Sequence, residues 1–212
     1  MHVTLFGVVL FLHITVVIVA FAMAGVMHTA LNVVPRGRST QELRAWGAVM
    51  HRIEPLFPLL ALLLLGLGIW LVHLGAHTDD AFSFKDGWVI TAIVTLVVVE
   101  AAGGIILAPH GKKLTGLIEH APDGPVTDEI ITTATRTLFW DVVHITTFGF
   151  LGVVFLMAAK PSGAWAPVFP VVGALVGLVL SRAQLRAIGN ARSAGTVPSQ
   201  REAAGEAAEA RA

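Results

Sequence analysis

The chain has 212 residues, and its 14 Lys and Arg balance its 14 Asp and Glu, so no net charge points to a nucleic-acid partner or a polyanionic substrate. Hydrophobic residues make up 55% of the chain and charged residues only 13%, about half the charged share of a soluble domain. There is no cysteine, which excludes disulfides, thiolate catalysis and iron–sulfur ligation.

Long apolar segments dominate the chain. A helix needs about 20 apolar residues to cross the hydrocarbon core of a bilayer, and only helices or closed barrels satisfy the backbone there. The segments lack the alternation of strands, so each is predicted to be a membrane-spanning helix. Five segments qualify: 5–34, 46–74, 88–108, 138–159 and 164–180. The predicted fold is therefore an all-α, polytopic transmembrane bundle.

The first span contains a short sequence, Ala22-Met23-Ala24, that resembles a signal-peptidase site. A signal peptide opens with basic residues and carries only a short apolar stretch. Here no Lys or Arg precedes Arg36, and the apolar run continues past the candidate site. The first span is therefore predicted to be retained.

Polar side chains recur at one depth in the first four spans. At a rise of 1.5 Å per residue, His28, His51 and His144 lie about 8–9 Å inside the same membrane surface. The carboxylates of Glu54 and Glu100 lie about 12 Å inside that surface. Ionisable side chains are costly in a bilayer and usually face the interior of a bundle. The predicted polar layer contains His28, Asn32, His51, Arg52, Glu54, Glu100, Asp141 and His144.

Charge is distributed unevenly between the two sides of the predicted bundle. With five spans, 12 of the 14 basic residues fall on one side, and only Lys85 and Lys160 fall on the other. An excess of Lys and Arg in short loops faces the cytoplasm. The prediction is a multi-pass protein of a bacterial-type plasma (inner) membrane, with its N-terminus outside and its C-terminus in the cytoplasm.

Two segments lie outside the spans. Between the third and fourth spans, Leu114, Leu117 and Ile118 recur at helical spacing among charged residues, which predicts a short amphipathic helix lying on the cytoplasmic interface. Residues 1–188 are predicted to form the membrane domain. Residues 189–212 are rich in Ala, Glu, Gly and Arg without an apolar face, and they are predicted to be a disordered or loosely helical cytoplasmic tail.

The fifth span carries Gly173 and Gly177, a pair of small residues one helical turn apart. Such pairs are typical of close packing between membrane helices. The first four spans are expected to form a four-helix core, with the fifth at its edge. The expected partners are therefore the lipid bilayer and a second copy of the chain, bound through these two glycines.

One hypothesis is that the histidines bind a single b-type haem or a metal ion. Imidazoles on separate helices of a bundle are typical axial ligands of such a haem, and His28 with His51 or with His144 are the candidate pairs. Asp141 would orient a ring nitrogen of His144, which lies three residues later on the same helix face. His13 lies fifteen residues before His28 and on nearly the same face.

A second hypothesis is a pathway for protons or small solutes in which Glu100 is the titrating group. Carboxylates and histidines in series build proton relays in membranes. Gly103 and Gly104 follow on the same helix face, so another helix is expected to approach Glu100 closely.

A third hypothesis is that the layer only packs the bundle. Its charged residues, Glu54 among them, would then pair with one another, while the histidines and Asn32 donate interhelical hydrogen bonds worth under about 2 kcal/mol each.

A glycine-rich phosphate loop, an H-E-x-x-H motif and a G-x-S-x-G motif do not occur. This favours a protein that is not an enzyme, and leaves open a membrane enzyme acting on a lipid or a porphyrin.

Two stretches, LFLHITVVIVAFAMAG and DGWVITAIVTLVVVEAAGGIILAPHGKKL, resemble an uncharacterised bacterial family of predicted integral membrane proteins. The matching residues are His13, Trp88, Gly103, Gly104, Lys112 and Lys113. More loosely, the chain is similar to CopD-type copper-resistance and HemJ-type porphyrinogen-oxidase membrane bundles. The HemJ type implies a haem ligand at His13, although this chain lacks the Lys of that type in its first two spans. The resemblance thus favours His13 as the ligand, and the depth argument favours His28.

Overall fold

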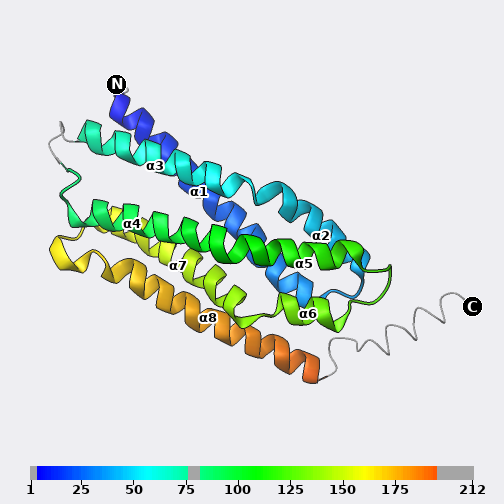
Figure 1. Ribbon diagram of the computed structural model, residues 1–212. Coiled ribbons are helices and arrows are strands. Elements are labelled where there is room, and N and C mark those ends of the chain that lie inside the picture. Colours follow the sequence, from blue (N-terminus) through cyan, green and yellow to red (C-terminus); the bar gives the residue numbers. More distant parts are fainter. Residues whose placement is uncertain (1–3, 76–81, 195–212) are drawn as a thin grey trace, which may run out of the picture.

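A computed structural model of the chain describes residues 4–75 and 82–194. Figure 1 shows long helices running side by side in an elongated bundle, and the described residues contain no strand. The predicted all-α fold is confirmed. The helices are α1 (Leu5–Val33), α2 (Thr40–Ile53), α3 (Leu56–Gly75), α4 (Gly87–Ala102), α5 (Ala108–His120), α6 (Asp128–Ala134), α7 (Thr137–Ala159) and α8 (Val168–Ser193), with short turns η1 (Val34–Arg36), η2 (Gly103–Leu107) and η3 (Gly163–Trp165).

Five helical segments within the described residues are long and apolar enough to span a membrane, as the sequence predicts. They are Leu5–Arg36, Thr40–Gly75, Gly87–His120, Asp128–Ala159 and Gly163–Ser193. The third has 34 residues, which corresponds to about 50 Å of helix, whereas the hydrocarbon core is about 30 Å thick. The bundle is therefore longer than a membrane is thick.

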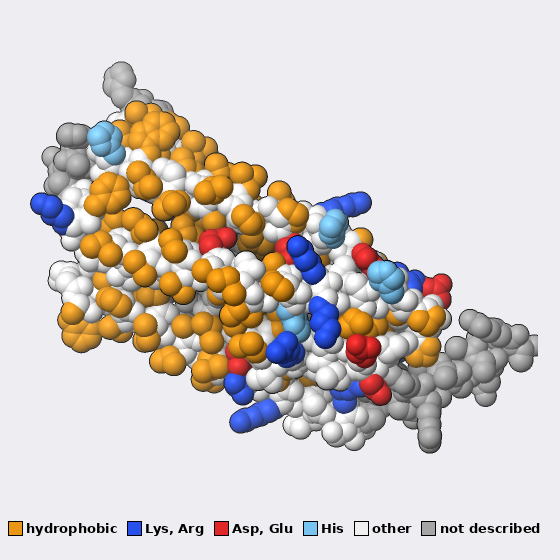
Figure 2. All heavy atoms as spheres, in the orientation of Figure 1, with side chains coloured by type: hydrophobic (Ala, Val, Ile, Leu, Met, Phe, Trp, Pro, Cys, Tyr) orange, Lys and Arg blue, Asp and Glu red, His pale blue; other side chains and the backbone are white. Residues whose placement is uncertain are grey.

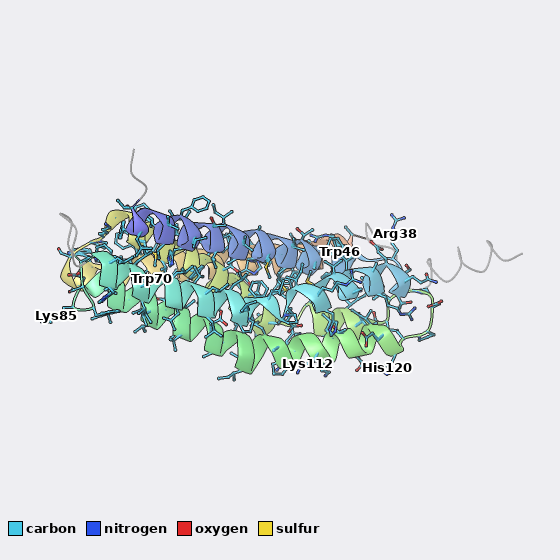
Figure 3. All side chains as sticks on the ribbon, turned by 90° about the horizontal axis from the view of Figure 1, so that it is seen from above. Arg38, Trp46, Trp70, Lys85, Lys112 and His120 are labelled. Atoms are coloured by element: carbon cyan, nitrogen blue, oxygen red, sulfur yellow. The ribbon has the colours of Figure 1, made fainter. Side chains whose placement is uncertain are left out.

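The excess length lies at one end, which we call the basic end and which is formed by η1, α2, α5, α6 and the last turns of α8. Figure 2 shows most of the charged and histidine side chains of the visible face gathered over this end, while hydrophobic side chains dominate the rest of that face. Figure 3 shows Lys85 at the opposite end from Arg38 and His120.

The basic end has an apolar core of its own. Leu43 of α2 and Ile118 of α5 are buried there together with residues of η1, α6 and the preceding loop. The Thr40 hydroxyl donates to the carbonyl oxygen of Pro122 over 2.9 Å. The guanidinium of Arg44 donates to the Asp123 carboxylate and to the Ala121 carbonyl. These contacts tie α2 to the loop that follows α5.

The structure bears on two sequence-based expectations at this end. The segment 108–120 is helical as predicted but is not a separate short helix, because α5 continues α4 through the π-helical turn η2 and packs against α2 (Figure 1). Its residues Leu114, Leu117 and Ile118 pack into the apolar core of the basic end. At the start of the predicted tail, α8 extends to Ser193, so residues 189–193 are helical; residues 195–212 lie outside the described part of the chain.

The tightest helix packing joins α7 and α8, the fourth and fifth spans. A Cβ atom at Gly173 would overlap the carbonyl oxygen of Phe148, and one at Gly177 would overlap that of His144. The glycine face of α8 is therefore covered by α7 of the same chain. A homodimer stays a prediction, and the two glycines proposed for it serve contacts within the chain.

Candidate functional site

Two of the predicted histidines, His28 of α1 and His144 of α7, lie in direct contact. Their rings meet edge to face, with centroids 4.6 Å apart and an interplanar angle of 83°. His144 is buried, with 1% of its surface exposed, and His28 is partly buried. Of the two candidate pairs, the structure thus brings together His28 and His144.

Hydrogen bonds orient the buried ring of His144. Its Nδ1 lies 2.8 Å from the backbone oxygen of Trp140, and because a carbonyl only accepts, Nδ1 carries a proton. Its Nε2 lies 3.2 Å from the side-chain oxygen Oε1 of Gln184 on α8, and the amide nitrogen takes that place if the amide turns over. An amide can donate to a neutral ring through its nitrogen or accept from a charged ring through its oxygen. The indole of Trp140 stacks on the ring at 5.6 Å.

His28 has an equally adaptable partner. Its Nε2 lies 3.1 Å from the hydroxyl oxygen of Thr147, one turn beyond His144 on α7. A hydroxyl both donates and accepts, so the contact is kept whether Nε2 is protonated or not. Each histidine of the pair therefore has a neighbour that tolerates both protonation states.

An open groove leads from the basic end to His28. It has a volume of about 610 Å³. Within it the Asn32 amide donates to the His28 carbonyl over 2.9 Å, and Arg36 donates to the carbonyl of Asn32 over 2.7 Å. Its lining residues are His28, Thr29, Asn32, Val33, Arg36 and Glu42. His28 thus lies between the groove and the more deeply buried His144.

Asp141 does not have the predicted position beside a ring nitrogen of His144. Its carboxylate accepts from Arg182 over 3.0 and 2.6 Å and from the Ser181 hydroxyl over 2.8 Å. The reason is the close packing at Gly177, which brings the following turn of α8 against the first turns of α7. The backbone oxygen of Trp140 takes the orienting role instead.

The remaining members of the predicted layer stand apart from the histidine pair. His51 is exposed on α2. Glu54 ends α2, and its Oε1 lies 3.6 Å from where a Cβ of Gly111 would stand. Glu100 is partly buried in the last turn of α4. Equal depth therefore places these side chains at similar heights without bringing them together.

His13 forms a separate buried site between α1 and α3. It is 7% exposed, and its ring lies beside Gly68. Its Nδ1 is the one buried side-chain nitrogen or oxygen without a hydrogen-bond partner among the described residues. Fifteen residues of helix separate His13 from His28 by about 22 Å, so the two histidines cannot share one small ligand.

The histidine pair does not fit a haem held from both faces. Such a haem needs its iron and porphyrin between the two imidazoles, with a ring nitrogen pointing at the iron from each side. Here the rings touch, and three of their nitrogens face Thr147, Trp140 and Gln184. Within the described part of the chain, no three His, Cys, Asp or Glu side chains gather as a metal site would require.

Sequence reasoning missed the residues that complete the site. Thr147 was recognisable, because it lies three residues after His144 and so on the same helix face. Gln184 and Arg182 carried no such signal, because they follow the predicted end of the fifth span at 180. Their role depends on how α8 packs against α7.

Comparison of the chain with protein-family models, with curated proteins and with solved structures finds no match. The resemblance to CopD-type and HemJ-type bundles therefore stays a prediction, and the functional argument rests on the geometry of the site.

Proposed function

We propose that this protein binds and transfers protons in a membrane through the His28–His144 pair. The observation that carries the proposal is the direct contact between the two imidazole rings, one of which lines an open groove while the other is buried behind it. Imidazole is a common proton-transfer group in proteins, and ionisable side chains inside a membrane bundle usually serve a substrate or proton route.

The pair is suited to carrying one proton at a time. Two positive rings 4.6 Å apart would repel each other by roughly 3–4 kcal/mol at an effective dielectric constant near 20. The pair therefore accommodates one positive charge more readily than two. The Thr147 hydroxyl and the Gln184 amide can each donate or accept, so Nε2 of His28 and Nε2 of His144 keep a hydrogen-bond partner when the proton arrives or leaves.

The proposal includes an orientation. The basic end would face the cytoplasm of a bacterial-type plasma membrane, with the N-terminus outside, which is supported by the excess of Lys and Arg at that end. Protons would then enter the groove from the cytoplasm and reach His28 first.

Proton flux into liposomes tests the proposal. The purified protein is reconstituted with a pH-sensitive dye inside, and a potassium diffusion potential drives proton entry. His28→Ala and His144→Ala are each expected to lower the flux at least about tenfold, because each removes one of the two proton carriers. His51→Ala is the matched control, since this exposed histidine has a similar predicted depth. Wild-type flux equal to that of empty liposomes would reject the proposal and leave the purely structural hypothesis.

A second candidate function, haem binding, is favoured by one observation at His13. A buried imidazole nitrogen without a hydrogen-bond partner is uncommon and calls for an explanation, and a bound group would supply the missing partner. A haem there would provide electron transfer, with His13 as its ligand. The test is a reduced-minus-oxidised visible spectrum: haem bands should be lost in His13→Ala and kept in His28→Ala, and a featureless wild-type spectrum would exclude haem.

A further inference from the structure

Glu100 is an intramembrane carboxyl group that the histidine site does not use. It lies in the last turn of α4, inside the third apolar segment, and is partly exposed. No hydrogen bond or ion pair to its carboxyl group occurs among the residues that the structure describes. Asp141 offers the contrast, because Arg182 and Ser181 saturate its carboxylate.

The helix changes from α-helical to π-helical geometry at Gly103, three residues after Glu100. The turn η2 is π-helical, and the N–H of Ala108 donates to the carbonyl of Gly103 five residues earlier. Single π-helical turns inside α-helices occur frequently at functional sites. A Cβ atom built on Gly103 or on Gly104 would meet no atom within 4 Å. The expected close approach of another helix is therefore wrong for this chain, and the surface beside Glu100 is uncovered.

The neighbouring residues indicate that this surface meets lipid. Val97, Val98 and Ile105 are all exposed, with 55%, 60% and 75% of their surfaces accessible. Residues three apart on a helix are neighbours, so Glu100 borders the strip that contains Val97. A carboxylate at this position would lack both water and a counter-charge, and in hydrocarbon the group avoids that cost by binding a proton.

We propose that Glu100 is a second proton-binding site, a neutral carboxylic acid that is reached from the lipid and is separate from the His28–His144 pair. Its participation in flux rests on the proposed function, whereas its chemical state and accessibility do not. The predicted chemistry is modification by an apolar carbodiimide such as dicyclohexylcarbodiimide. The acid proton moves to a carbodiimide nitrogen while a carboxyl oxygen bonds to the central carbon, and the resulting O-acylisourea rearranges to a stable N-acylurea without a leaving group.

The experiment labels the purified full chain in detergent micelles. One sample receives dicyclohexylcarbodiimide, and a parallel sample receives a water-soluble carbodiimide with an added amine. Intact-mass and peptide mass spectrometry then locate the adducts. We expect the apolar reagent to give a single adduct on Glu100, and the water-soluble reagent to modify exposed acidic residues such as Glu42 and Asp123 but not Glu100.

Two variants identify the reacting group. Glu100→Gln should remove the apolar adduct, and Glu54→Gln, the matched control, should keep it. Absence of an apolar adduct, an adduct at another carboxyl group, or equal modification of Glu100 by the water-soluble reagent would overturn the proposal. A second copy of the chain that covered Glu100 would appear as an unlabelled dimer in gel filtration and would also count against lipid access.

Flux measurements separate this inference from the proposed function. If the histidine pair carries protons and Glu100 takes part, labelled protein should lose most of its flux while the Glu100→Gln variant treated with the reagent keeps its own rate. An adduct on Glu100 in a protein without any flux would uphold the carboxylic acid and reject the proton pathway. Proton flux in a protein that gives no adduct on Glu100 would uphold the proton pathway and reject the lipid-accessible carboxylic acid.

Discussion

The α7–α8 pair and the α4–η2 segment contain similar residues that behave in opposite ways. Each has glycines beside an acidic residue at a membrane boundary or within the membrane. In α7–α8 the glycines admit a neighbouring backbone, and Asp141 gains Arg182 and Ser181 as partners. In α4–η2 nothing approaches the glycines. Close packing thus supplies Asp141 with partners that Glu100 lacks among the described residues.

The largest expected effect concerns the glycines themselves. Gly177→Ala should destabilise the fold by about 2–3 kcal/mol, because its Cβ would overlap the backbone of α7 and backbone atoms cannot rotate away. Gly104→Ala should change stability by less than about 1 kcal/mol and in the stabilising direction, since alanine favours a helix. Thermal unfolding in detergent, followed by tryptophan fluorescence, compares the two. Equal losses for both variants would refute the contrast.

Substitution of the acidic residues should also destabilise the α7–α8 pair more than the α4–η2 segment, with a smaller difference in the free energy of unfolding than for the glycines. Asp141→Asn is expected to cost about 1–2 kcal/mol, because Arg182 and Ser181 lose a charged acceptor while solvent around the half-exposed Arg182 screens the ion pair. Glu100→Gln should stay within about 0.5 kcal/mol, because a neutral acid is replaced by a neutral amide of similar shape. The same unfolding assay applies, and a Glu100→Gln variant that is the less stable of the two would show that Glu100 is charged and paired.

The smallest effect is expected outside the membrane, where solvent weakens a charged contact. A side-chain hydrogen bond from Arg44 holds the pKa of Asp123 below its usual range. A lowered folded-state pKa means that the contact stabilises the basic end at pH values above the ordinary Asp range and that this contribution is lost as the pH falls. Limited proteolysis of the loop 121–127 between pH 6 and pH 3 should therefore accelerate in the wild type. Asp123→Asn should be cleaved faster at pH 6 and show a smaller pH dependence, whereas parallel curves would contradict the assignment.

Several features could be predicted from the sequence because they depend on composition along a single helix. The five apolar segments identify the spans, since each must satisfy its own backbone in lipid. The shared depth of His28 and His144 follows from the rise of a helix, and the structure places their rings in contact. Depth fixes only one coordinate, which is why His51 was grouped with them although it is exposed on α2.

The tertiary structure decided which residues of equal depth meet. The sequence determined an all-α bundle with its basic residues at one end, because hydropathy and charge are properties of each segment alone. The direction in which each helix faces depends on its neighbours. The packing of α8 against α7 pairs Asp141 with Arg182 and places Gln184 beside His144. It also places Gly173 and Gly177 against the backbone of α7. It also left the carboxyl group of Glu100 and Nδ1 of His13 without a hydrogen-bond partner among the described residues.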